Sequence, residues 1–107
     1  MAYREQLADR LRIALDPTLA LQERRMFGGL IFLLRGSMLC GTSNDDFMFR
    51  AGAERMDEAL RQGGARPIRL GARAPMTGFV WVASGAVAGN RLDLWLDWCL
   101  DFQNNLD

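Results

Sequence analysis

The chain has 107 residues, of which half are apolar and about a quarter are charged, the usual composition of a globular protein. This length is near the common size of one domain, so we expect a single domain over residues 1–107. Thirteen basic and thirteen acidic residues give a net charge of zero, which excludes a long-range field that would attract nucleic acid or an anionic membrane.

The first predicted element is an amphipathic helix from about Tyr3 to Leu15. Leu7, Leu11 and Leu15 recur at helical spacing, and charged residues fill much of the remaining wheel. Pro17 ends this helix because the residue before a proline is displaced from the α region. Residues 18–23 are then predicted to be a loop.

Residues 24–50 are predicted to be a meander of antiparallel strands. Their apolar runs are too short to span a membrane and are separated by turn-forming residues. Gly28–Gly29 marks a bulge, a tight turn or a close backbone approach, and we expect a structural role for it rather than ligand binding. Arg35–Gly36 and Ser43–Asp46 are the other predicted turns.

Within this meander, the segment Leu30–Leu34 is apolar at every position. Side chains alternate along a strand, so both faces of this strand are apolar. A sheet covered by helices on one side only would leave the second face in water. We therefore expect a further cover, either another helix or a second subunit, and hence a homodimer.

A short helix is predicted after Gly52, with Met56, Ala59 and Leu60 on one face. Gly63–Gly64 supplies its C-terminal stop.

The following residues, 65–77, contain two prolines and are predicted to form a loop with a short edge strand at Ile68–Leu70. A clear strand follows at residues 78–83.

The last predicted helix begins after Asn90, a good N-cap residue. Trp98 and Leu94 fall outside its main apolar stripe, which indicates either a contact surface or the edge of the core. The stripe contains Leu92, Trp95, Leu96, Cys99, Phe102 and Leu106, and another face carries Asp93, Asp97 and Asp101, which we expect to be solvated.

The available side chains exclude most catalytic chemistry. The chain has no histidine, which removes Ser-His and Cys-His arrangements, histidine zinc sites and the usual general base near neutral pH. Two cysteines do not make a thiolate zinc site, and Gly28–Gly29 lacks the surrounding pattern of a phosphate loop. We therefore expect no catalytic residues, no metal site and no cofactor, with a Cys40 nucleophile as the remaining enzymatic alternative.

The two cysteines, Cys40 and Cys99, belong to no CxxC pattern and fall within apolar runs, so we expect buried free thiols; a disulfide or a redox role is the alternative. The first residues lack a basic run followed by an apolar segment, and no window approaches about 18 consecutive apolar residues. We therefore expect a cytoplasmic protein without a membrane span.

Arginine is the only charged residue type from Arg61 to Arg91. These arginines either pair with the aspartates of the last helix or are solvated, which contributes little to stability. The alternative is a patch that contacts phosphate and binds nucleic acid weakly, which the zero net charge disfavours. The patch would contain Arg24, Arg25, Arg66, Arg69 and Arg73.

Several segments together resemble the N-terminal domain of the TfoX/Sxy family, bacterial regulators of competence genes. The resemblance covers nearly the whole chain and rests on Arg25–Leu30, Phe32, Phe47–Gly52, Arg66–Pro67 and Met76–Val82. We expect the motif residues to be mainly structural. These residues are Arg25, Met26, Phe27, Gly28, Gly29, Met76, Gly78 and Phe79.

The resemblance implies a two-layer α+β fold, similar to secretion-chaperone-like folds. An antiparallel sheet, made of the meander around residues 24–50 and the strand at 78–83, would pack with three helices. The chain-order analysis predicts the same sequence of helix, strands, helix, strands and helix. Two departures accompany the resemblance: no second, helical domain follows within these residues, and Thr77 stands where relatives often have lysine.

The family's role is to assist a transcription activator through protein contacts, and no catalytic residues are known for this domain. The resemblance therefore implies a stand-alone, non-enzymatic regulatory or protein-interaction module with a protein partner such as a transcription factor. We expect no membrane binding and no nucleic-acid binding. The candidate interaction residues are Arg24, Arg25, Arg66, Arg69, Arg73 and Trp98.

Overall fold

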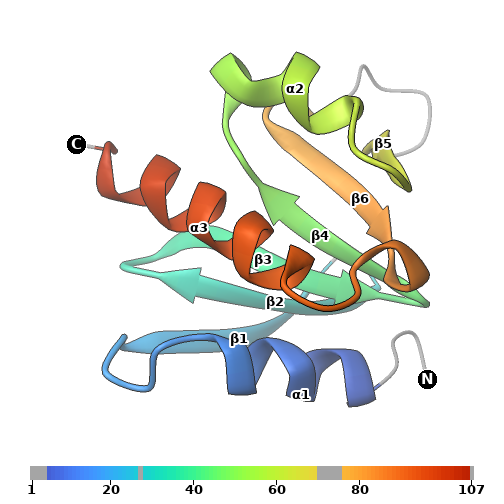
Figure 1. Ribbon diagram of the computed structural model, residues 1–107. Helices are drawn as coiled ribbons and strands as arrows, with labels where there is room; N and C mark the ends of the chain where they lie inside the picture. Colours follow the sequence, from blue (N-terminus) through green and yellow to red (C-terminus); the bar gives the residue numbers. More distant parts are fainter. Residues whose placement is uncertain (1–4, 27, 70–75, 107) are drawn as a thin grey trace.

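A computed structural model describes residues 5–26, 28–69 and 76–106 (Figure 1). It has the predicted α+β fold, in which three α-helices pack on one face of an open, six-stranded antiparallel sheet. The strand order is β1-β2-β3-β4-β6-β5. The elements are α1 (Glu5–Ala14), β1 (Leu21–Met26), β2 (Gly29–Leu34), β3 (Ser37–Ser43), β4 (Asp46–Arg50), the 3₁₀ turn η1 (Ala53–Arg55), α2 (Met56–Leu60), β5 (Ala65–Pro67), β6 (Phe79–Ala83), the 3₁₀ turn η2 (Ser84–Ala86) and α3 (Arg91–Asn104).

Tight turns join β1 to β4 into the predicted meander, and each contains a residue with positive φ. Gly28 has φ 72° between β1 and β2. Arg35 and Gly36 have φ 53° and 80° between β2 and β3, the pattern of a type I′ hairpin turn. Asn44 has φ 54° between β3 and β4, so the two predicted turns are confirmed, and a turn at Gly28 is one of the alternatives given for Gly28–Gly29.

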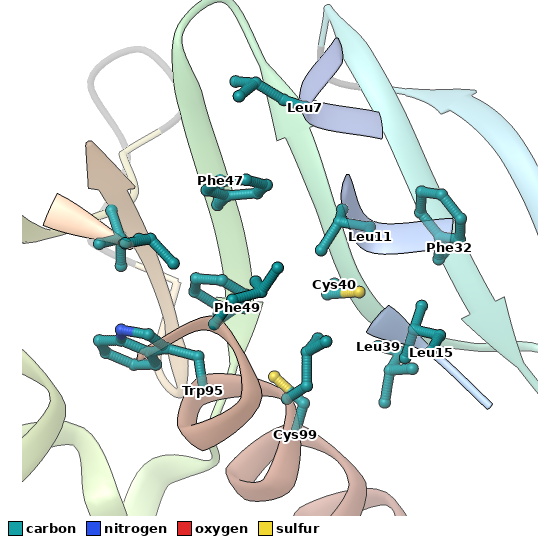
Figure 2. Close-up of a cluster of buried hydrophobic side chains, with 14 of the residues drawn as sticks. Leu7, Leu11, Leu15, Phe32, Leu39, Cys40, Phe47, Phe49, Trp95 and Cys99 are labelled. Atoms are coloured by element: carbon teal, nitrogen blue, oxygen red, sulfur yellow. The ribbon is translucent and has the colours of Figure 1, made fainter. Parts of the chain in front are cut away.

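The main core lies between the helices and the inner face of the sheet (Figure 2). Trp95 of α3 stacks on Phe49 of β4 with ring centroids 5.0 Å apart, and Phe49 stacks on Phe47 at 5.7 Å. Aromatic contacts of this kind add to the stabilisation that comes from removing apolar area from water. The labelled core residues in Figure 2 are Leu7, Leu11, Leu15, Phe32, Leu39, Cys40, Phe47, Phe49, Trp95 and Cys99.

A second, smaller cluster lies on the opposite face of the sheet. All residues of β2 are buried, so the prediction that both faces of Leu30–Leu34 are kept from water is confirmed. The expected cover was another helix or a second subunit, but Ile68 and Met76 of the same chain pack in this cluster. The cluster contains Ile31, Leu33, Met48, Ile68 and Phe79, with Met26, Met38, Met76 and Trp81 packed against them.

The two edge strands differ from the prediction. Residues 18–23 were predicted to be a loop, but β1 begins at Leu21 and pairs with β2. The other edge strand, β5, covers Ala65–Pro67 rather than Ile68–Leu70, and Leu70 lies outside the described residues. Edge strands have one free side and one mostly exposed face, so the apolar alternation that marks a strand is weak in both.

The helix boundaries also differ slightly. Tyr3, the predicted first residue of α1, lies outside the described residues. Leu106 was predicted to belong to the stripe of α3, but it follows the end of the helix and is 39% exposed. Of the helices that the structure describes, none has the length and apolar character needed to cross a membrane.

Candidate functional site

The first family motif is explained by the close approach of β2 to β3. A Cβ atom on Gly29 would lie 1.9 Å from the backbone oxygen of Thr42, so only glycine fits there. Gly28 makes the turn with positive φ, and its carbonyl oxygen accepts a hydrogen bond of 3.3 Å from the Ser43 hydroxyl. Both glycines therefore have structural roles, and Phe27 lies outside the described residues.

The second motif is explained by a contact between two glycine backbones. Gly78 has φ 90°, and a Cβ atom on it would lie 3.1 Å from the nitrogen of Ala53 and 3.2 Å from atoms of Gly52. The Gly52 N–H donates to the carbonyl oxygen of Gly78 at 3.1 Å. A Cβ atom on Gly52 would lie 2.4 Å from the ring of Phe102, so α3 also packs directly on this backbone.

The remaining motif residues that the structure describes lie mostly in or near the second cluster. Met26 and Met76 pack against it, and Phe79 belongs to it. The Arg50 guanidinium lies 5.0 Å from the ring centroid of Phe79 and 4.8 Å from that of Phe102. Arg50 also donates to the carbonyl oxygen of Met38 at 3.4 Å, and partial burial lowers the pKa of its side chain. These contacts are those of a packing unit.

The arginines proposed as one patch lie on different edges of the sheet. Arg24 and Arg25 are exposed on β1, whereas Arg66 is on β5, and the other four strands separate these two. Arg66 also forms an ion pair of 2.5 Å with Asp46 of β4. Arg69 is exposed beyond β5, and Arg73 lies outside the described residues. The structure therefore does not bring Arg24 and Arg25 together with Arg66.

The two cysteines are free and fully buried in the main core, as predicted. Burial, together with the neighbouring Cys99, holds the pKa of Cys40 well above its ordinary value. Burial likewise raises the pKa of Cys99 to about 12, although a backbone hydrogen bond from Arg50 opposes this shift. Because the thiolate is the nucleophile, both side chains are in environments typical of structural thiols.

Carboxylates and thiols do not gather into a metal-binding cluster in the part of the chain that the structure describes. Within residues 5–26, 28–69 and 76–106, no group of three or more Cys, Asp or Glu side chains is placed to hold a metal ion.

Trp98, the last candidate interaction residue, lies on α3 at the boundary between core and solvent. It is half-buried, and its ring meets that of Trp95 edge-on with centroids 5.3 Å apart. The Arg55 guanidinium lies 5.6 Å from the Trp98 centroid and forms an ion pair of 2.9 Å with Asp101. One turn before Trp98, the side chain of Leu94 is 45% exposed. We call the residues Asp93, Leu94, Asp97, Trp98 and Asp101 the outer face of α3.

A hollow adjoins the C-terminal end of this outer face. It has a volume of about 520 Å³ and lies where η1 approaches the last turns of α3. The ion pair between Arg55 and Asp101 forms part of its wall. The lining residues are Ala51, Gly52, Ala53, Glu54, Arg55, Asp101, Phe102 and Asn105.

The contacts of Gly52 and Arg55 with α3 and the burial of Gln103 were not predicted from the sequence. Gly52 and Arg55 meet α3 through contacts between segments far apart in the chain, which no local pattern shows. Gln103 is buried and donates to the carbonyl oxygen of Leu34 at 3.0 Å. Gln103 follows Leu96 and Cys99 at helical spacing, and this spacing is the sequence pattern that indicates its burial.

The chain matches one family model, described as the TfoX N-terminal domain, over residues 14–102. This match covers most of the chain, and it contains both glycine motifs, every lining residue of the hollow except Asn105, and the outer face of α3. No curated protein and no solved structure matches the chain.

Proposed function

Because the chain belongs to the family of TfoX N-terminal domains, we propose that it is a regulatory protein-interaction module and not an enzyme. The family match carries this proposal, since the TfoX N-terminal domain is not a known enzyme family. The proposed partner is a protein that controls transcription, and the proposed compartment is the cytoplasm. A role in competence is the form of regulation that the family resemblance favours.

Two features of the structure support the interaction role. The described motif residues other than Arg25 form a turn, lie close to neighbouring backbone or pack in or against the second cluster. Both thiols are buried, which does not suit nucleophilic catalysis. Both observations favour a role in protein contacts over a role in catalysis.

The experiment is affinity capture followed by binding of purified components. The tagged chain is retrieved from a lysate of its native cells, retained proteins are identified by mass spectrometry, and each candidate is purified and titrated by calorimetry. We expect a transcription regulator to bind with a dissociation constant at or below the micromolar range. If no purified candidate binds better than an unrelated domain of similar size and charge, the proposed function is wrong.

The homodimer remains a prediction. The original reason for it was an uncovered second face, and residues of the same chain partly supply that cover, because Ile68 belongs to the second cluster and Met76 packs against it. A dimer would therefore use another surface, such as the free edge of β1. Light scattering over a wide concentration range measures the mass, and a persistent monomer would contradict the prediction.

A further inference from the structure

The outer face of α3 combines apolar and acidic side chains on one helical surface. Leu94 and Trp98 are four residues apart, so they lie one above the other on the helix. Leu94 is 45% exposed and Trp98 is half-buried. Aromatic residues with one ring edge in the core and the rest accessible are frequent anchors at protein interfaces.

The charges on this face are of one sign and are only partly compensated. Asp93, Asp97 and Asp101 follow each other at intervals of four, a spacing at which like charges destabilise a helix by a few tenths of a kcal/mol. Asp101 pairs with Arg55. In the described part of the chain, Asp93 and Asp97 are exposed and make no ion pair. A basic partner would supply the missing opposite charges.

The opposite face of α3 is packed firmly against the main core. Trp95, Leu96 and Cys99 are buried in the main core, and the buried Gln103 bonds to the backbone of β2. Arg91 at the start of α3 donates to the carbonyl oxygen of Ala86 at 3.1 Å. The outer face is therefore ordered before any partner arrives, which lowers the entropic cost of binding.

The hollow extends the outer face beyond its last aspartate. Asp101 belongs to both, so a segment lying along Leu94 and Trp98 would place its end over the hollow. The volume of about 520 Å³ accommodates a large side chain. Glu54 in the lining adds a further carboxylate to this end of the surface.

We propose that the outer face of α3 docks a basic amphipathic segment of the protein partner. The apolar side chains of that segment contact Leu94 and Trp98, and its Lys or Arg side chains pair with Asp93 and Asp97. This is the mode in which an amphipathic helix presents its apolar stripe to a complementary surface. The inference rests on the proposed function, because it names where the partner binds and the chemistry that is recognised.

The same charges argue against other occupants. Nucleic acid and anionic membranes would meet carboxylates on this face and be repelled. A second copy of the chain would bring another net charge of zero, without an excess of basic residues. A basic protein segment is the occupant that the charges favour.

The test uses the purified full chain and two synthetic peptides of about 18 residues, a length that forms a helix of about five turns. One peptide is a fluorescein-labelled Leu/Lys amphipathic helix, and the other has glutamate in place of every lysine. We expect the Leu/Lys peptide to bind, with salt weakening the binding, and the Leu/Glu peptide not to bind. Shifts in the backbone amide NMR spectrum should gather at residues 93–101, and shifts centred elsewhere would overturn the proposal.

Two double variants test whether the peptide binds to the outer face of α3 or to acidic residues anywhere on the protein. Leu94→Gln combined with Asp97→Arg should weaken binding of the Leu/Lys peptide about tenfold or more, since it removes an apolar contact and reverses a charge. The matched control combines Ile13→Gln, which alters a side chain 85% exposed on α1, with Glu58→Arg, which alters an exposed residue of α2. The control should stay within about twofold of the original affinity. Equal losses in both variants, or none in either, would overturn the proposal.

Binding experiments with the captured partner show whether the docking proposal or the proposed function fails. If a purified partner binds and the Leu94→Gln, Asp97→Arg variant binds it equally well, the function stands and the assigned surface is wrong. If no partner is found but the Leu/Lys peptide binds as described, the surface is supported while the proposed function fails. If the variant dissociates a dimer in light scattering, the face belongs to a second copy and the proposal is overturned.

Discussion

Single glycines in this domain mark the points where backbones come into contact. Gly29 and Gly78 belong to two motifs far apart in the sequence, yet each lies against the backbone of a neighbouring segment. The approach of Gly29 to Thr42 allows the β2–β3 ladder, while that of Gly78 to Gly52 fixes the route from β4 to η1. In this domain, the glycines of both motifs are therefore explained by backbone geometry, without a bound ligand.

Gly29→Ala should destabilise the domain markedly. The added Cβ would lie 1.9 Å from the Thr42 oxygen, and backbone cannot move aside as a flexible side chain can. We expect a loss of about 1–3 kcal/mol or more in the free energy of unfolding, the range for overpacking. Urea unfolding measures it. Gly63→Ala is the control because a Cβ there meets nothing within 4 Å, and equal effects of the two changes would contradict the explanation.

At the scale of elements, the clear sequence patterns belong to the parts that are buried. Strands β2, β4 and β6 are apolar runs between turn residues, and the long stripe of α3 has helical spacing, so all four are predicted from the sequence alone. Strand β1 is predicted only from residue 24 onward and its first half is predicted as a loop, because its partial burial is confined to its two ends and its middle is polar and charged. The spacing of apolar residues indicates which side chains are buried, and edge strands bury few side chains.

The candidate site was predictable only in part for a related reason. The helical wheel of α3 places Trp98 outside the main stripe, and the structure confirms that it is half-buried. The approach of Arg55 to Trp98 and Asp101 depends on how α3 crosses the sheet. Local sequence patterns carry no information on such a crossing, so neither the ion pair nor the hollow was predicted.

The ion pair between Arg12 of α1 and Glu23 of β1 should make the stability of the fold depend on pH. Arg12 donates to Glu23 at 2.9 and 2.7 Å, and this lowers the pKa of Glu23. A carboxylate whose pKa is lower in the folded state stabilises the fold above its ordinary pKa of about 4.3. That stabilisation is lost as the pH falls through the lowered value.

Arg12→Met should therefore cost about 1 kcal/mol or less at pH 7, as expected for partly exposed ion pairs. Arg12 also forms ion pairs with Glu5 and Asp9 at 2.8 and 2.7 Å, so the loss includes these contacts. The part due to Glu23 should shrink as the pH falls below about 4, because protonated Glu23 no longer gains from Arg12. Thermal unfolding from pH 3 to pH 7 measures both quantities. Arg61→Met, at an exposed arginine directly after α2, should show no such dependence. A difference that persists unchanged at pH 3 would contradict the role of Glu23.

At the scale of the whole molecule, both thiols should report global unfolding. Cys40 and Cys99 are buried between β3 and α3, and burial raises the pKa of each. A thiol reagent such as Ellman's should therefore react only when the domain opens, at a rate that rises with urea as unfolding does. The single variants Cys40→Ala and Cys99→Ala assign each signal. Rapid reaction of Cys40 in the native chain would reopen the enzymatic alternative.

The distribution of charge over the whole molecule bears on nucleic acid, the alternative partner. The net charge is zero, and of the arginines proposed as a phosphate patch, Arg24 and Arg25 lie on β1 while Arg66 lies on the opposite edge strand β5 and is already paired with Asp46. Binding through phosphate contacts strengthens steeply as salt is lowered, so low salt gives the alternative its best chance. We expect no shift of a labelled DNA or RNA duplex in a gel even at about 20 mM salt, where screening is weak. A shift that disappears with added salt and with Arg24→Gln and Arg25→Gln together would contradict this expectation and place a nucleic-acid surface on β1.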